Sequence, residues 1–122
     1  MGFRVQGLDH VALSVGDQQA SESWYRDVLG LGREHAAAWG DTPVALMAEG
    51  SGLALFRATD GGERPLGLRH IAFRVDRENF DAAQDDLRNR GIAFEFQDHE
   101  VSHSIYFQDP DGLQLELTTY EV

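Results

Sequence analysis

The sequence predicts an α+β protein built from two β-α-β-β-β modules. The main observation is an internal repeat, in which residues 67–75 (GLRHIAFRV) copy residues 7–15 (GLDHVALSV) at an offset of 60. Leucines alternate with polar residues over residues 113–118, which is typical of a strand with one buried face. The sequence DPDG at residues 109–112 predicts a tight hairpin turn. A module of about 55 residues is too small to bury its own sheet, so the two modules must pack together.

The first module is expected to begin with a strand over residues 5–15, whose polar face carries His10. Asp17 is suited to cap the following helix, and Gly30 is suited to end it after Leu29. The remaining elements are a strand over residues 34–39 and a hairpin of residues 43–47 and 53–58. A Gly-rich linker over residues 59–65 then divides the chain near its middle.

The second module repeats this order. A strand over residues 67–75 leads to Asp76, which is expected to cap a helix that stops at Gly91. One face of that helix carries Phe80, Ala83 and Leu87. The module closes with a strand over residues 92–96 and the hairpin around the DPDG turn. We therefore predict one domain over residues 1–122, with modules at 1–60 and 66–122.

The composition excludes several functional classes. The formal net charge of −11 argues against nucleic acid as a partner, because phosphate binding needs a basic surface. No apolar run approaches the roughly 20 residues of a membrane span, so no membrane partner is expected. The chain has no cysteine, which favours a cytoplasmic protein without disulfide or thiol chemistry.

The repeat brings three metal-binding side chains to comparable strand positions. His10 and His70 are equivalent at the offset of 60, and Glu116 is equivalent to Phe56. Counting outward from the turn places Tyr106 opposite Glu116 in the last hairpin. Two imidazoles and one carboxylate form a facial metal triad, which suits Fe(II), Mn(II), Zn(II) or Ni(II) and leaves positions open for substrate. A buried carboxylate also favours a cation as its partner.

Three sets of residues resemble the vicinal oxygen chelate superfamily, which includes glyoxalases, bleomycin-resistance proteins and extradiol dioxygenases. They are the paired LxHxAxxV strands, the run WYRDVLGL at residues 24–31, and YFQDPDG at residues 106–112 followed by Glu116 and Leu117. The resemblance implies a cupped, barrel-like mixed sheet with the helices outside, and a homodimer. It also implies that His10, His70 and Glu116 are the metal ligands.

Differences between this chain and individual members of the superfamily narrow the choice of function. Glyoxalase I and methylmalonyl-CoA epimerase use a fourth ligand on the strand that here carries Phe56, which cannot bind a metal. Fosfomycin-resistance enzymes carry a basic residue beyond the last ligand, whereas this chain ends TTYEV. Bleomycin-binding proteins lack the ligands. Extradiol dioxygenases place a tyrosine ten residues before the glutamate, as Tyr106 stands here, with a histidine upstream.

We therefore expect a metal-dependent enzyme, most like a single-domain extradiol dioxygenase with Fe(II) and a small catechol-like substrate. Tyr106 and His103 are the expected catalytic residues, with His99 nearby. The substrate pocket is expected to be lined by Phe56, Arg74, Trp39 and Met47. The alternatives are a glyoxalase-type lyase or isomerase, a resistance transferase, and a metal-free drug-binding protein. Whether the modules pair within one chain or between two chains stays open.

Overall fold

A computed structural model describes residues 2–122 and divides them into two compact units. The N-terminal unit is His10–Arg69. The C-terminal unit is residues 2–9 together with His70–Val122. The boundaries fall inside the first strand of each repeat, after Asp9 and after Arg69. Within the described residues, no helix is long and apolar enough to cross a membrane. The predicted α+β class, with β-α-β-β-β order in each half, is confirmed.

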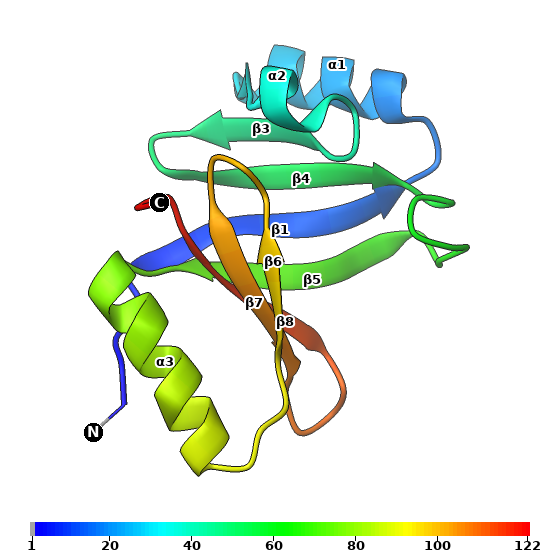
Figure 1. Cartoon of the computed structure of the whole chain (residues 1–122). Helices are drawn as coiled ribbons and strands as arrows, with labels where there is room; N and C mark the ends of the chain where they lie inside the picture. The colour runs from blue at the N-terminus through cyan, green and yellow to red at the C-terminus, as the bar shows by residue number, and fades with distance from the viewer. Residues whose placement is uncertain (1) are drawn as a thin grey trace. The chain divides into compact units, whose positions relative to one another are not determined.

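The strands of the N-terminal unit follow the order β2-β3-β4-β1 (Figure 1). β1 runs parallel to β4, and the other neighbours are antiparallel. Its elements are β1 (Gly7–Val15), α1 (Gln18–Leu29), β2 (Gly32–Glu34), α2 (Ala36–Trp39), β3 (Val44–Ala48) and β4 (Ser51–Arg57). The buried core of this sheet consists of Val44, Leu46 and Leu55.

Local signals fix the ends of α1 as predicted. The Asp17 side chain accepts a hydrogen bond from the backbone N–H of Ala20 at 3.0 Å, which caps the first turn. Gly30 adopts φ +73° and closes the last turn, a left-handed conformation that glycine adopts without steric cost.

The prediction of one strand over residues 34–39 is wrong. The strand β2 ends at Glu34, and residues 36–39 form the single helical turn α2 after His35, which adopts a left-handed conformation. Alanine has the highest helix propensity of all residues, and three consecutive alanines begin this turn. Four residues are too few for hydrophobic periodicity to reveal a helix.

The C-terminal unit repeats the arrangement with the strand order β5-β8-β7-β6 (Figure 1). β5 runs parallel to β8, as β1 does to β4. Its elements are β5 (Gly67–Arg74), α3 (Arg77–Asn89), β6 (Glu95–Asp98), β7 (His103–Gln108) and β8 (Gln114–Thr119). The strand predicted at residues 92–96 thus lies about three residues further along the chain, a typical error for an element boundary.

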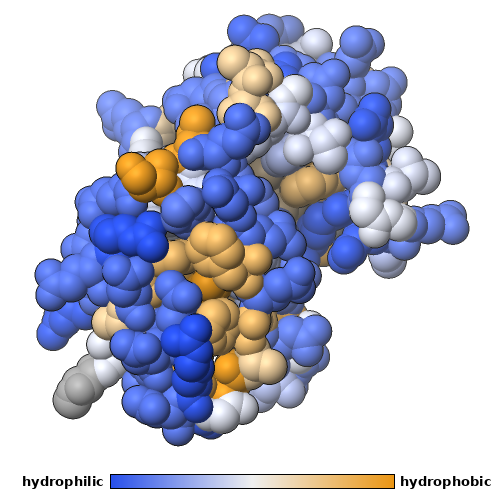
Figure 2. Space-filling model, in the orientation of Figure 1, coloured by the Kyte–Doolittle hydropathy of each residue, from blue (hydrophilic) through white to orange (hydrophobic). Residues whose placement is uncertain are grey.

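Helix α3 covers one face of this sheet. Asp76 caps it, as predicted, by accepting from the backbone N–H of Asn79 at 2.8 Å. Its apolar face is buried against two strand residues, and the resulting core consists of Val75, Phe80, Ala83, Leu87, Ile105 and Leu117. Figure 2 shows apolar side chains on the surface of the molecule. Ile92 and Phe96 are exposed, and the Phe96 ring lies 6.3 Å from that of the core residue Phe80, centroid to centroid. Because Ile105 and Leu117 face α3, their neighbours along each strand face the other side of the sheet.

The β7–β8 turn has the predicted geometry. Gly112 adopts φ +86°, and the backbone N–H of Asp109 donates to the carbonyl of Leu113 at 3.0 Å. In the ladder that follows, Tyr106 lies opposite Glu116, as counting from the turn predicted. The turn therefore sets the register that brings these two side chains to one face.

Candidate metal centre

Three strands of the C-terminal unit bring His70, Glu116 and Tyr106 to one face of the sheet. Glu116 on β8 lies opposite Tyr106 on β7 and opposite Ala72 on β5. His70 precedes Ala72 by two residues and therefore points to the same side. This face is the one turned away from α3. Polar side chains can collect there because the apolar core lies on the opposite face.

The central contact is between His70 and Glu116. His70 Nε2 lies 2.9 Å from Glu116 Oε1, and the two side chains are only 7% and 4% exposed. The other carboxylate oxygen, Oε2, accepts a hydrogen bond from Ser104 Oγ at 2.7 Å. A buried carboxylate is costly unless it is paired and hydrogen-bonded. Ser104 thus orients Glu116, while Oε1 faces the imidazole.

Tyr106 stands beside this pair with its hydroxyl protonated. Burial, and after it the charge of Glu116, raises the pKa of the Tyr106 hydroxyl far above its ordinary range. The Tyr106 oxygen lies 2.8 Å from His99 Nε2. The Tyr106 ring also meets the His70 ring edge to face, with 5.8 Å between the centroids. A phenol in this environment holds its proton and acts as a hydrogen-bond donor rather than as a base.

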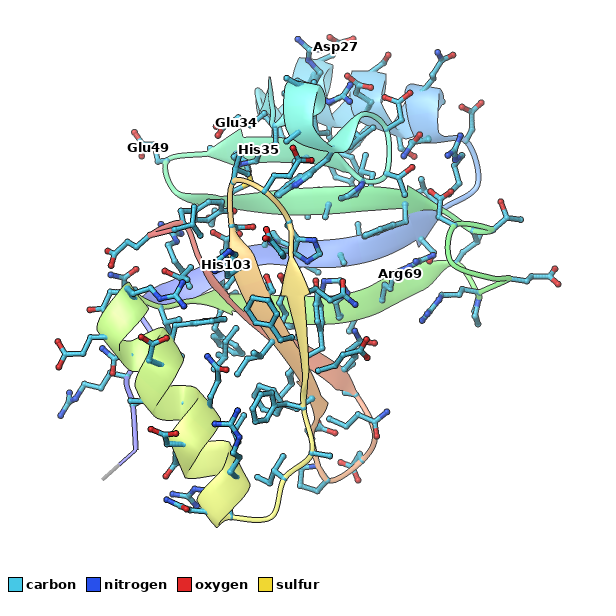
Figure 3. The ribbon with its side chains drawn as sticks, in the orientation of Figure 1. Asp27, Glu34, His35, Glu49, Arg69 and His103 are labelled. Carbon is cyan, nitrogen blue, oxygen red and sulfur yellow. The ribbon has the colours of Figure 1, made fainter. Side chains whose placement is uncertain are left out.

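His103 lies elsewhere. It shares the face of Ile105, toward α3, where its Nδ1 accepts a hydrogen bond from Arg77 Nη1 at 3.0 Å. Asp98 Oδ1 lies 3.6 Å from the other ring nitrogen. The structure therefore does not bring His103 to Tyr106 and Glu116, because residues 103 and 106 differ by an odd number along one strand. Figure 3 labels His103 on β7.

Arg74 is engaged by a buried acid. Asp9, which is 1% exposed, lies 3.2 Å from Arg74 Nε. Its second oxygen accepts a hydrogen bond from the Tyr120 hydroxyl at 2.9 Å. Burial first, and then the charge of Asp9, raises the pKa of Tyr120 well above its ordinary range. Asp9 therefore joins the N-terminal segment to Arg74 at the end of β5 and to Tyr120 after β8, and the guanidinium of Arg74 already has an anionic partner.

The other predicted residues belong to the N-terminal unit. His10 lies opposite Gly52 on β4, and Gly52 lies opposite Met47 on β3, so Met47 shares the His10 face. Phe56 pairs with Ser14 in the same ladder, four residues further along β1. Trp39 lies on α2, where its ring centroid is 4.4 Å from that of His35. Met47 and Phe56 therefore follow the His10 strand face, while Trp39 sits on a separate helical turn.

Two residues of the site were not predicted as such. Ser104 precedes Tyr106 by two residues, so strand alternation was a usable signal for its contact with Glu116. His99 was noted but not chosen. It reaches Tyr106 from the turn between β6 and β7, where the backbone N–H of His99 donates to the Ser102 carbonyl. The geometry of such a turn has no counterpart in strand periodicity.

Comparisons with known proteins agree with this fold. Residues 7–117 match the family model of the Glyoxalase/Bleomycin resistance protein/Dioxygenase superfamily. The chain is 34% identical to the uncharacterized protein YaeR of Escherichia coli, over 90% of this chain and 93% of YaeR. It is 30% identical to the glutathione transferase FosA of Serratia marcescens, over 93% of this chain and 80% of FosA. The methylmalonyl-CoA epimerase of Mycobacterium tuberculosis superposes with a TM-score of 0.75 at 25% identity, covering 94% and 88% of the two chains.

Proposed function

Because the chain belongs to the Glyoxalase/Bleomycin resistance protein/Dioxygenase superfamily, we propose that it is a divalent-metal-dependent transferase. Its substrate is a small molecule with two neighbouring oxygen atoms. The named relatives guide this choice, since FosA is called a glutathione transferase. They do not support the expected extradiol dioxygenase. The lyase or isomerase alternative keeps some support from the fold shared with an epimerase.

The observation that carries the proposal is the distance between His70 Nε2 and Glu116 Oε1, which is 2.9 Å. Nitrogen and oxygen ligands lie about 2.1 Å from a divalent transition metal, so two ligand atoms at a right angle are about 3 Å apart. The pair thus has the spacing of two adjacent corners of a coordination sphere. Imidazole with carboxylate is also the donor set of non-haem Fe(II), Mn(II), Zn(II) and Ni(II) sites.

We include His10 as the third ligand. It is the repeat counterpart of His70, and each histidine lies in the same LxHxAxxV strand sequence. Its side chain follows the strand face that also carries Ser14 and Phe56. The counterpart of Glu116 is Phe56, which offers no donor atom, so the proposed set consists of three protein ligands. Three ligands leave coordination positions for a substrate.

The second coordination sphere comes from Ser104 and Tyr106. Ser104 donates to Glu116 Oε2 at 2.7 Å and fixes the orientation in which Oε1 points toward His70. A bound divalent cation would polarise the substrate oxygens and stabilise negative charge on them. Tyr106 keeps its proton at neutral pH and is placed to donate it in a hydrogen bond to a substrate oxygen. His99, 2.8 Å from the Tyr106 oxygen, replaces His103 as the proposed partner of this tyrosine.

The proposal also includes the identity of the metal and the oligomeric state of the chain. The metal is divalent, with Fe(II) the first candidate and Mn(II), Zn(II) and Ni(II) the others. The chain forms a homodimer, as the family resemblance implies. Light scattering on the purified protein tests the second expectation, and a mass of one chain at micromolar concentration would contradict it.

The test of the function has two arms. The protein is loaded anaerobically with each of the four metals, desalted and analysed for metal content, and we expect about one ion per chain. Each loaded form is then given glutathione with a panel of electrophiles that carry neighbouring oxygens, and separately catechols with O2. Formation of a thioether, followed by mass spectrometry, supports the transferase. Oxygen uptake with a catechol would favour the dioxygenase, and absence of bound metal would favour a metal-free binding protein.

A further inference from the structure

Arg69 occupies an unusual position at the last residue of the N-terminal unit (Figure 3). Its guanidinium lies over the Phe56 ring, with Cζ 4.4 Å from the ring centroid. Its Nε donates to Ser14 Oγ at 3.0 Å. Ser14 and Phe56 lie opposite each other in the β1–β4 ladder, on the strand face that carries His10. An arginine side chain is thus held flat on this face by an aromatic ring and a hydroxyl.

Among residues 2–122, the hydrogen bonds of Arg69 go to uncharged acceptors. Besides Ser14, they are the Asp60 carbonyl, 2.9 Å from Nη1, and the Arg57 carbonyl, 3.3 Å from Nη2. Each terminal nitrogen therefore keeps a second hydrogen for a ligand. Gly61 has no side chain to cover Nη1, since even a Cβ atom there would already be in van der Waals contact with this nitrogen at 3.8 Å.

The carboxylate of Asp60 is shared with Arg57 and only partly offsets the charge of Arg69. Both oxygens of Asp60 are engaged by Arg57, through its backbone N–H at 2.8 Å and its Nε at 3.1 Å. Arg64 adds a second positive charge nearby. Burial, followed by the charge of Arg64, lowers the pKa of Arg69, and Asp60 only partly opposes this. The guanidinium is therefore a partly buried cation whose charge an incoming anion would offset.

We propose that Arg69, stacked on Phe56 and steadied by Ser14, is a subsite for the carboxylate group of an organic substrate. Guanidinium binds carboxylate with two parallel hydrogen bonds and stacks well on aromatic rings. Ser14 follows His10 by four residues, which corresponds to about 13 Å along a strand. The inference thus rests on the proposed metal site and sharpens it. The substrate is an elongated carboxylate, longer than a simple catechol, with its metal-binding oxygens at one end.

The alternative role for Arg69 is structural, because it also ties the linker carbonyls of Arg57 and Asp60 to the end of β1. A purely structural arginine gives no response to added carboxylates. NMR of the 15N-labelled, EDTA-treated full chain separates the two roles, since the Nε–H resonance of Arg69 reports directly on its ligands. Benzoate is the probe, and benzamide is its uncharged control. Because metal is removed, failure of the metal proposal does not affect the result.

We expect benzoate to shift the Arg69 Nε–H and Ser14 amide resonances saturably, and benzamide to leave them unchanged. Arg69→Gln should weaken benzoate binding about tenfold or more, since a charge-assisted bidentate contact is lost. Arg26→Gln, a half-exposed arginine on α1 of the same unit, is the matched control and should change affinity less than twofold. Circular dichroism checks the fold of each variant.

A second variant covers the case in which Arg69→Gln does not fold. Ser14→Ala keeps the charge of Arg69 and its stacking on Phe56 but removes the hydroxyl that holds its Nε–H, so benzoate should bind about threefold more weakly than to the original chain. Equal shifts with benzoate and benzamide, unchanged affinity in folded Arg69→Gln, or unchanged affinity in Ser14→Ala would each overturn the proposal.

Discussion

The two modules place opposite charges at equivalent positions. In the C-terminal unit, the acid Asp9 binds Arg74 at 3.2 Å and Tyr120 at 2.9 Å. In the N-terminal unit, the residues at the offset of 60 make a different cluster. There the guanidinium of Arg69 lies at the position equivalent to Asp9 and binds Ser14 and the Asp60 carbonyl, at 3.0 and 2.9 Å. The C-terminal unit thus holds a buried carboxylate, Asp9, paired with an arginine. At the equivalent position the N-terminal unit holds an arginine, Arg69, whose hydrogen bonds go to uncharged acceptors.

The same divergence holds for the last strand of each module. Glu116 on β8 is buried against His70 and Ser104, whereas its counterpart Phe56 on β4 lies under Arg69. The backbone ladders are alike, with a parallel β1–β4 pair and a parallel β5–β8 pair. The repeat thus supplies the scaffold, and a few substitutions on one strand face give the two units different chemistry. In our proposals, Glu116 provides an anionic metal ligand and Arg69 provides a site for an anion.

The largest expected effect comes from removing the carboxylate that distinguishes the units. Glu116→Gln keeps the shape of the side chain and a hydrogen-bond acceptor for Ser104, but loses the charge. We expect the affinity for divalent metal to fall by on the order of 100-fold or more, because an anionic ligand is lost. Isothermal titration with Mn(II) measures it. Glu95→Gln, on exposed β6, is the control, and an equal loss in both variants would remove the distinction between Glu116 and a general acidic surface.

The second-largest expected effect is the loss of stability when the carboxylate of Asp9 is replaced. Asp9→Asn leaves the Arg74 guanidinium beside an uncharged amide, and we expect the free energy of unfolding to fall by about 2 kcal/mol, since Arg74 is partly exposed. Urea denaturation followed by circular dichroism measures the change. Asp111→Asn in the exposed β7–β8 turn serves as the control. A loss for Asp9→Asn no greater than for Asp111→Asn would show that the buried cluster contributes little.

Ser14→Ala removes the counterpart contact in the N-terminal unit. A single hydrogen bond to a guanidinium that has other acceptors is lost, so the free energy of unfolding should fall by about 1 kcal/mol. The same denaturation experiment measures it. The account requires this loss to be smaller than that of Asp9→Asn, and the reverse order would mean that Arg69 depends on Ser14 more than Arg74 depends on Asp9.

The smallest expected effect is a decrease in the free energy of unfolding at alkaline pH, caused by Tyr120. Because the pKa of Tyr120 is raised in the folded chain, the unfolded chain loses this proton first, near its ordinary pKa of about 10. Stability is therefore complete below pH 10 and decreases as the pH rises further. Between pH 8 and 10.5, Tyr120 should lower the free energy of unfolding by less than about 1 kcal/mol.

Tyr120→Phe should make the unfolding free energy decline less steeply over this pH range than in the original chain. Val28→Ala, at an exposed position of the N-terminal unit, changes no titratable group, so it is the control and should keep the original slope. Equal slopes in all three proteins would indicate that Tyr120 ionises equally well in the folded and unfolded chains.

Two kinds of sequence signal account for the correct predictions. They are residues that cap helices or form turns locally, and the alternation of polar and apolar residues along strands. Asp17, Asp76 and Gly112 act within a few residues, and each does what its side chain or conformation favours. The count from Gly112 also gave the Tyr106–Glu116 register, because a turn of known length fixes the pairing. The His70–Glu116 contact followed from placing both residues on polar strand faces.

Tertiary contacts decide the surroundings of the residues that the sequence placed less well. His103 was chosen over His99 on proximity in sequence, although its odd spacing from Tyr106 places it on the α3 face. Arg74 was expected to meet substrate, and only the folded chain reveals that Asp9 binds it. Arg69 carried no signal at all, because its role depends on Phe56 and Ser14, which lie far from it in sequence.

The most direct measurement is anomalous diffraction from crystals of the full chain grown with Mn(II). The account predicts one strong peak within about 2.3 Å of His70 Nε2, Glu116 Oε1 and a His10 ring nitrogen. A peak elsewhere on the acidic surface, or no peak beside His70 and Glu116 in crystals that contain Mn(II), would contradict it.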